Sequence, residues 1–130
     1  MKLKDSIVIA IDFDGTCVEH AYPAIGIEAE GAVETLRELN RRNHRLLLLT
    51  MRSGQRLDEA VRWFRERNVT LWQVNTNPEQ STWSSSPKIY ADIYIDDTAL
   101  GCPIRYVEGS QRGVVDWQVV HHELRLRGIL

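Results

Sequence analysis

The sequence has only two cysteines, Cys17 and Cys102, among its 130 residues. They are far apart and do not form the closely spaced pair of zinc or redox motifs, so we expect two reduced thiols in a cytoplasmic protein. No apolar run is long enough to cross a membrane, and the charged first residues do not resemble a signal peptide. With a formal net charge of −2, the charge balance indicates neither a nucleic-acid polymer nor a membrane surface as a partner.

Length and composition favour one compact domain. A chain of 130 residues can bury one core and has little room for a second. Apolar residues make up 43% of the sequence and charged residues 26%, which is ordinary for a globular protein. We therefore expect a single domain over residues 1–130.

Strand-like and helix-like apolar patterns alternate along the chain. Buried strands are predicted over residues 6–11, 46–49, 69–74, 92–95 and 104–107. Helices with one apolar stripe are predicted over residues 28–42, from an N-cap at Ser53 onward, and over 113–127. A loop is predicted over 75–86 and a short helical turn over 87–91. This order predicts an α/β fold, with one open parallel, Rossmann-like sheet and helices on both faces.

Polar side chains stand at the ends of several predicted strands. The first strand ends at Asp12-x-Asp14-x-Thr16, the second at Thr50, and the fourth runs into Asp96 and Asp97, so four carboxylates would come together. Because ligands of open α/β sheets bind outside the carboxyl ends of the strands, we expect these side chains to share one crevice. Lys88 would reach the crevice from the loop before the fourth strand.

These residue types together indicate phosphoryl transfer. Clustered carboxylates repel one another unless a cation joins them, and oxygen ligands without His or Cys suit Mg²⁺. Such an ion would also polarise a phosphoryl oxygen. One aspartate of Asp12-x-Asp14 would attack phosphorus, and the other would move protons to and from the oxygens. Gly15 would permit a tight turn after the pair.

The order Asp12-x-Asp14-x-Thr16, Thr50, Lys88, Asp96-Asp97 resembles the haloacid dehalogenase (HAD) superfamily of phosphatases. More narrowly, residues 12–26 and 88–97 look like a group of small bacterial and phage members without a cap domain. The resemblance implies a HAD-like fold and a Mg²⁺-dependent phosphomonoester hydrolase that acts through an aspartyl-phosphate on Asp12.

The resemblance also implies a role for each acidic residue. Asp12 would be the nucleophile and a Mg²⁺ ligand. Asp14 would be the general acid and base, and its backbone carbonyl would bind the ion. Asp97 would be the third ligand with Asp96 behind it, or the two would exchange these places.

Other matched positions would hold the substrate. The resemblance implies that Thr50 and Lys88 bind the phosphoryl group, that Lys88 orients the nucleophile, and that Thr16 assists binding. Arg52 would contact a substrate phosphate or base, or would be a surface residue at a helix entry. His20 would face the cleft or would be an ordinary loop histidine.

The spacing of the motifs leaves no room for a folded cap domain between Asp14 and Thr50 or between Thr50 and Lys88. We therefore expect an open site. Its substrate would be a phosphorylated nucleic-acid end or protein, or a phosphorylated metabolite or nucleotide in a cleft that homo-oligomerisation covers.

Two alternatives of another class stay open. The first is a non-enzymatic phospho-acceptor similar to a bacterial receiver domain. In receivers the acidic pair ends the first strand and the acceptor ends a later strand, which is the reverse of the order found here. The second is a degenerate phosphatase retained as a phosphate-binding module, although no residue of the core set is missing.

Overall fold

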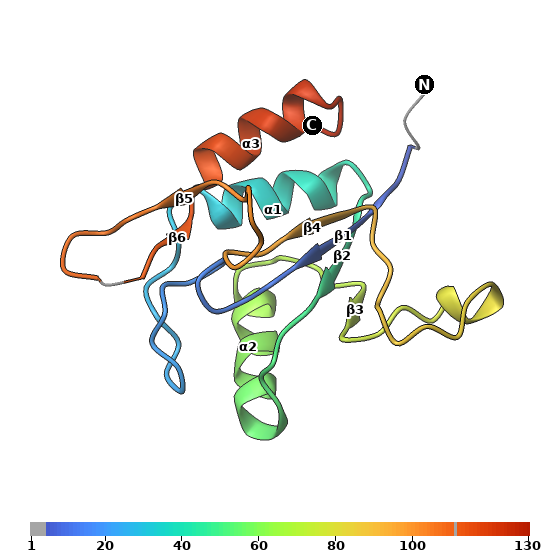
Figure 1. The fold of residues 1–130 in the computed structure, drawn as a ribbon, viewed down its shortest axis with the longest axis horizontal. Helices are drawn as coiled ribbons and strands as arrows, with labels where there is room; N and C mark the ends of the chain where they lie inside the picture. The colour runs from blue at the N-terminus through green and yellow to red at the C-terminus, as the bar shows by residue number, and fades with distance from the viewer. Residues whose placement is uncertain (1–4, 111) are drawn as a thin grey trace.

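The computed structural model describes residues 5–110 and 112–130 (Figure 1). Its main sheet has four parallel strands in the order β3-β2-β1-β4. These strands are β1 (Val8–Ile11), β2 (Arg45–Leu48), β3 (Gln73–Val74) and β4 (Ile93–Ile95). The helices are α1 (Ala32–Arg41), α2 (Gly54–Glu66), α3 (Trp117–Leu126) and the short 3₁₀ helix η1 (Gln80–Thr82). The predicted α/β class and its parallel sheet are confirmed.

Strand β1 lies between β2 and β4 and is buried along its whole length, as its uninterrupted apolar sequence predicts. In the register of the sheet, Ile11 pairs with Leu48 on one side and with Ile95 on the other. The ladder continues one step further, where the N–H of Asp12 donates to the carbonyl of Ile95 at 3.0 Å. The carboxyl ends of β1 and β4 therefore bring Asp12 beside Asp96.

The two faces of the sheet are covered differently. Ile9 and Ile11 point into the main core, which contains buried residues of α1, α2 and α3. Val8 and Ala10 point to the opposite face, where a smaller cluster includes Ala91 and, within the described chain, no helical residue.

The prediction of helices on both faces is thus corrected. Strands β1, β2 and β3 step across the sheet in one direction, so right-handed connections put α1 and α2 on the same face. The chain returns from β3 to β4 through residues 75–92, whose described helical content is η1 alone.

Several predicted boundaries change at the C-terminal end. The predicted strand 104–107 does not join the main sheet; β5 (Ile104–Arg105) instead pairs antiparallel with β6 (Val114–Val115). Helix α3 begins only at Trp117, because the side chain of Asp116 caps it by accepting the N–H groups of Gln118 and Val119. Residues 113–116, which were predicted as the start of this helix, therefore precede it.

Two other helical predictions also change. Helix α1 begins at Ala32 rather than at residue 28, after Gly31 adopts a left-handed φ of 85°. Residues 87–91 form no helical turn. Ser53 does occupy the N-cap position of α2, but its side chain makes no capping hydrogen bond. Among the described residues, no helix is both long and apolar enough to cross a membrane.

Candidate metal centre and its surroundings

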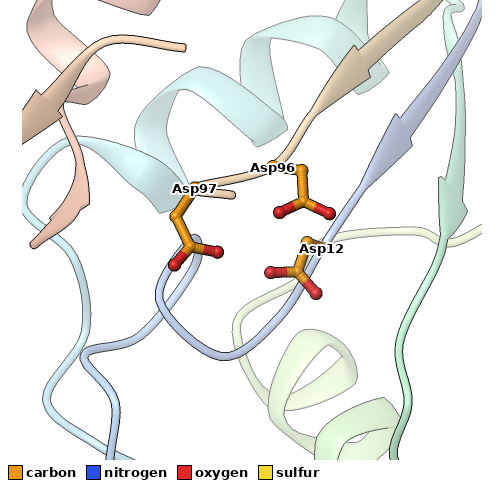
Figure 2. Close-up of side chains that lie close together, drawn as sticks. All are labelled: Asp12, Asp96 and Asp97. Carbon is orange, nitrogen blue, oxygen red and sulfur yellow. The ribbon is translucent and has the colours of Figure 1, made fainter. Parts of the chain in front are cut away.

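Three carboxylates converge at the carboxyl ends of β1 and β4 (Figure 2). Asp12, Asp96 and Asp97 each offer one carboxylate oxygen, and these oxygens all lie within 4.8 Å of one another. We call these three residues the acidic cluster. All three residues are partly or largely buried, so their mutual repulsion is only partly screened by water. The predicted convergence of Asp12 with Asp96 and Asp97 is therefore present in the structure.

The electrostatics of the acidic cluster centre on Asp12. Burial, the charge of Asp96 and a hydrogen bond with Asp97 together raise the pKa of Asp12 from 3.8 to about 8. Hydrogen bonds from the backbone of Phe13 and from Thr16 act in the opposite direction. A bound cation would offset the free-energy cost of ionising Asp12 beside Asp96. A donor set made of carboxylate oxygens fits a hard ion such as Mg²⁺. The residues present therefore fit the predicted metal.

Thr16 lies inside the acidic cluster rather than on its open side. Its hydroxyl is 3.1 Å from Oδ2 of Asp12 and 3.4 Å from Oδ1 of Asp97, and it accepts the N–H of Asp97 at 3.2 Å. The side chain is fully buried. A hydroxyl has one hydrogen, so Thr16 can donate to only one of these carboxylates at a time. The structure thus gives Thr16 a place between two cluster carboxylates.

His20 reaches the same cluster from the loop that follows β1. Its Nε2 lies 2.8 Å from Oδ2 of Asp97. Gly15 lies beneath this pair with a φ of 83°, and a Cβ at this position would overlap both the His20 ring and the Asp97 carboxylate. The site therefore needs glycine here for two reasons, a left-handed backbone and a lack of space.

The prediction that the Asp14 carboxylate joins the others is corrected, because Arg52 binds it outside the acidic cluster. Nε and Nη2 of Arg52 each donate to one carboxylate oxygen of Asp14, both at 2.8 Å. The Arg52 side chain is 1% exposed and that of Asp14 is 18% exposed, so this is a largely buried, two-pronged ion pair. The prediction that Arg52 is either a substrate contact or a surface residue is corrected, because its guanidinium is buried against Asp14.

Thr50 lies at the end of β2, as predicted, and is fixed there by its neighbours. Asn75 accepts the Thr50 N–H at 2.9 Å and donates to the Thr50 carbonyl at 3.1 Å. The Thr50 hydroxyl accepts the N–H of Arg52 at 3.1 Å. Sequence reasoning missed Asn75, although its position directly after β3 is the same signal that identified the other strand-end residues.

Lys88 makes no direct polar contact with the acidic cluster among the described residues. Its ammonium lies 5.7 Å from the centre of the Tyr94 ring, and no hydrogen bond or ion pair within the described chain joins it to Asp12 or Asp97. Lys88 does lie in the loop before β4, as predicted. The predicted role of Lys88 in orienting Asp12 has no direct contact to support it here, and it stays a prediction.

The fold and site define a class of α/β protein with a parallel sheet and a three-carboxylate cluster at its carboxyl edge. A solved structure of a conserved protein from Bacteroides thetaiotaomicron is 39% identical in sequence, covers 94% of this chain and 92% of its own, and superposes with a TM-score of 0.76. The chain belongs to the same family as that protein. No family model matches the chain, and no curated protein matches it.

Proposed function

We propose that this chain is a Mg²⁺-dependent phosphomonoester hydrolase of the HAD-like, capless kind, with Asp12 as its nucleophile. The observation that carries the proposal is the convergence of Asp12, Asp96 and Asp97 where β1 and β4 end. Further support comes from the separate position of Asp14, which is bound to Arg52 and stays outside the cluster. Two aspartates two positions apart thus have different surroundings, as two different chemical roles require.

The acidic cluster is the proposed Mg²⁺ site. Asp12 and Asp97 would ligate the ion, and Asp96 would either ligate it or bind its water ligands. Bound there, the ion would neutralise the carboxylates and polarise a phosphoryl oxygen. Thr16 and His20 would hold Asp97 in orientation through the contacts at 3.4 and 2.8 Å.

The reaction would proceed in two steps. A carboxylate oxygen of Asp12 forms a bond to phosphorus while the ester oxygen leaves with a proton from Asp14. Asp14 then takes a proton from water as the water oxygen bonds to phosphorus. The bond from Asp12 to phosphorus breaks, and inorganic phosphate is released.

The phosphoryl group would be held near the end of β2. The Thr50 hydroxyl accepts one hydrogen bond and donates none within residues 5–110 and 112–130, so its hydrogen could bind a phosphoryl oxygen. Helix α2 begins at Gly54, shortly after Thr50, so its first backbone N–H groups add the favourable end of a helix dipole. The absence of a cap leaves phosphorylated metabolites, nucleotides and nucleic-acid ends as substrate classes.

The test is hydrolysis of 4-nitrophenyl phosphate with Mg²⁺, with a chelator, and in the Asp12→Asn variant. Activity should require both the ion and Asp12, whereas Asp58→Asn, an exposed carboxylate on α2, should behave as wild type. Activity that survives both chelation and Asp12→Asn would reject the proposal. A long-lived phosphoryl group without turnover would indicate a phospho-acceptor, and ester binding without hydrolysis a binding module.

A further inference from the structure

The guanidinium of Arg52 has every N–H donor occupied. Nε and one N–H of Nη2 bind the two carboxylate oxygens of Asp14. The second N–H of Nη2 donates to the carbonyl of Ala24 at 2.8 Å. Nη1 donates to the carbonyls of Pro23 and Arg56 at 3.3 and 3.4 Å. These five contacts match the five N–H groups of a guanidinium, so none remains for a substrate.

The same side chain joins three separate segments. It connects the loop after β1, which carries Asp14, to the loop around Pro23 and to the first turn of α2. The guanidinium carbon also lies 5.1 Å from the ring centres of both Phe13 and Tyr22. The planar fork of an arginine in such surroundings fixes the orientation of a carboxylate as well as its position.

We propose that Arg52 is a positioning residue that aims the carboxylate of Asp14 for proton transfer. This inference rests on the proposed function. Each carboxylate oxygen of Asp14 uses one lone pair to accept a hydrogen bond from the guanidinium. The other lone pair of each oxygen remains available to bind a proton. Arg52 therefore restrains the acid and base without blocking it.

The proposal makes a distinction between substrates. In the first step, Asp14 gives its proton to the ester oxygen. The bond between this oxygen and phosphorus breaks while the bond between Asp12 and phosphorus forms. A 4-nitrophenolate leaves without this proton, whereas an alkoxide does not. In the second step every substrate needs Asp14 to remove a proton from water. A variant in which the Asp14 carboxylate is wrongly oriented should therefore be slow in the first step for alkyl esters only. It should be slow in the second step for all esters.

The experiment compares glycerol phosphate with 4-nitrophenyl phosphate in Arg52→Lys and Arg52→Ala. For the alkyl ester, kcat/KM should fall about 100-fold, mainly through kcat. For the aryl ester, kcat/KM should change less than about fivefold, and a burst of nitrophenolate should precede slow turnover. Asp14→Asn should show the same pattern, and adding Arg52→Lys to Asp14→Asn should have little further effect on either ester.

The matched control is Arg67→Lys. Arg67 pairs with Glu28 at 2.8 Å, donates to the Trp63 carbonyl and lies 4.3 Å from the Trp63 ring, so it makes the same kinds of contact without touching Asp14. It should leave both esters unaffected. Thermal unfolding identifies any variant that does not fold. If Arg52→Ala does not fold, Arg52→Lys alone provides the comparison of the two esters.

Two results would overturn the inference while leaving the proposed function intact. One is an equal loss of kcat/KM on both esters, and the other is the same pattern in Arg67→Lys; either makes Arg52 a purely structural residue. Failure of the wild type to hydrolyse either ester with Mg²⁺ would instead overturn the proposed function, and the inference with it.

Discussion

The indole N–H of Trp117 donates a hydrogen bond of 2.7 Å to the backbone carbonyl of Thr16, across 101 positions of the chain. Both residues are fully buried. Next to this bond, the N–H of Val115 donates to the carbonyl of Gly15 at 3.0 Å. The loop after β1, whose Thr16 contacts the acidic cluster, is therefore held by β6 and by the first turn of α3, so the C-terminal segment helps to position the site.

Replacing Trp117 by Phe should destabilise the protein and weaken Mg²⁺ binding. The buried carbonyl of Thr16 would lose its partner, which costs about 1–3 kcal/mol. The free energy of unfolding from urea titrations, with and without Mg²⁺, measures both effects. Trp83→Phe is the control, because Trp83 is 63% exposed and its change should stay within about 0.5 kcal/mol. Equal stability of the two variants would contradict this prediction.

Gly15→Ala should damage the metal site itself. The new methyl group would overlap the His20 ring and the Asp97 carboxylate, so we expect Mg²⁺ affinity to fall by about 10-fold or more. Gly101→Ala provides a matched control, because Gly101 has a similar φ of 95° but no atom within 4 Å of the added carbon. Both substitutions strain the backbone, by about 1–2 kcal/mol. The two variants should therefore differ in their affinity for Mg²⁺, which calorimetric titration measures. Equal affinities would be inconsistent with the crowding at Gly15.

The strands and their order of appearance could be predicted because a continuous apolar run as short as residues 6–11 is typical of a strand that is buried on both faces. The arrangement of layers could not. Whether a helix lies above or below a sheet depends on strand order, and that order is set by contacts distant in sequence. The stretch around Val114 and Val115 was predicted as helix because its apolar spacing also fits a helical stripe; pairing with β5 decided the outcome.

For the site, positions at the ends of strands were predictable and side-chain directions were not. The convergence of Asp12, Asp96 and Asp97 follows from the parallel register of β1 and β4. The pairing of Asp14 with Arg52 depends on how two loops pack, and no spacing in the sequence encodes it. The reach of Lys88 could not be predicted from its position, because it lies in the loop before β4 and the direction of a long side chain in a loop depends on tertiary packing.

Removing either of two nearby carboxylates should have opposite effects on the metal-free protein. Asp12→Asn removes a charge that burial and Asp96 make unfavourable, so at pH 8 in a chelator it should raise the melting temperature. Asp14→Asn leaves the buried charge of Arg52 without its carboxylate, which costs on the order of 3 kcal/mol. Thermal unfolding of both variants checks the signs. If the melting temperature shifted in the same direction in both variants, the two carboxylates would not differ in electrostatic surroundings as described.

The stability of the metal-free protein should fall as pH rises. Between pH 3.8 and about 8 the folded state holds a proton on Asp12 that the unfolded state has lost. The free energy of unfolding therefore decreases across this window and levels off above it. Urea titrations in a chelator should give this slope for wild type and a flatter one for Asp12→Asn. A steeper decline in the variant would contradict the assignment.

Mg²⁺ binding should accordingly release protons near neutral pH. Mg²⁺ binds the ionised carboxylate of Asp12. In the metal-free protein, the raised pKa of Asp12 keeps much of this carboxyl group protonated at pH 7. Calorimetric titrations in two buffers with different ionisation enthalpies measure the number of protons released. This number should fall as the pH rises above 8, and a value independent of pH would count against the assignment.

The most direct test of the proposed chemistry is to trap the covalent intermediate. Protein with Mg²⁺ is mixed with 4-nitrophenyl phosphate and quenched in acid on the timescale of one turnover, and the phosphorylated residue is located by peptide mass spectrometry. We predict a single phosphoryl group on Asp12 that decays as fast as phosphate is released and is absent from Asp12→Asn. A phosphoryl group on another residue, or undiminished turnover in Asp12→Asn without one, would contradict the proposal.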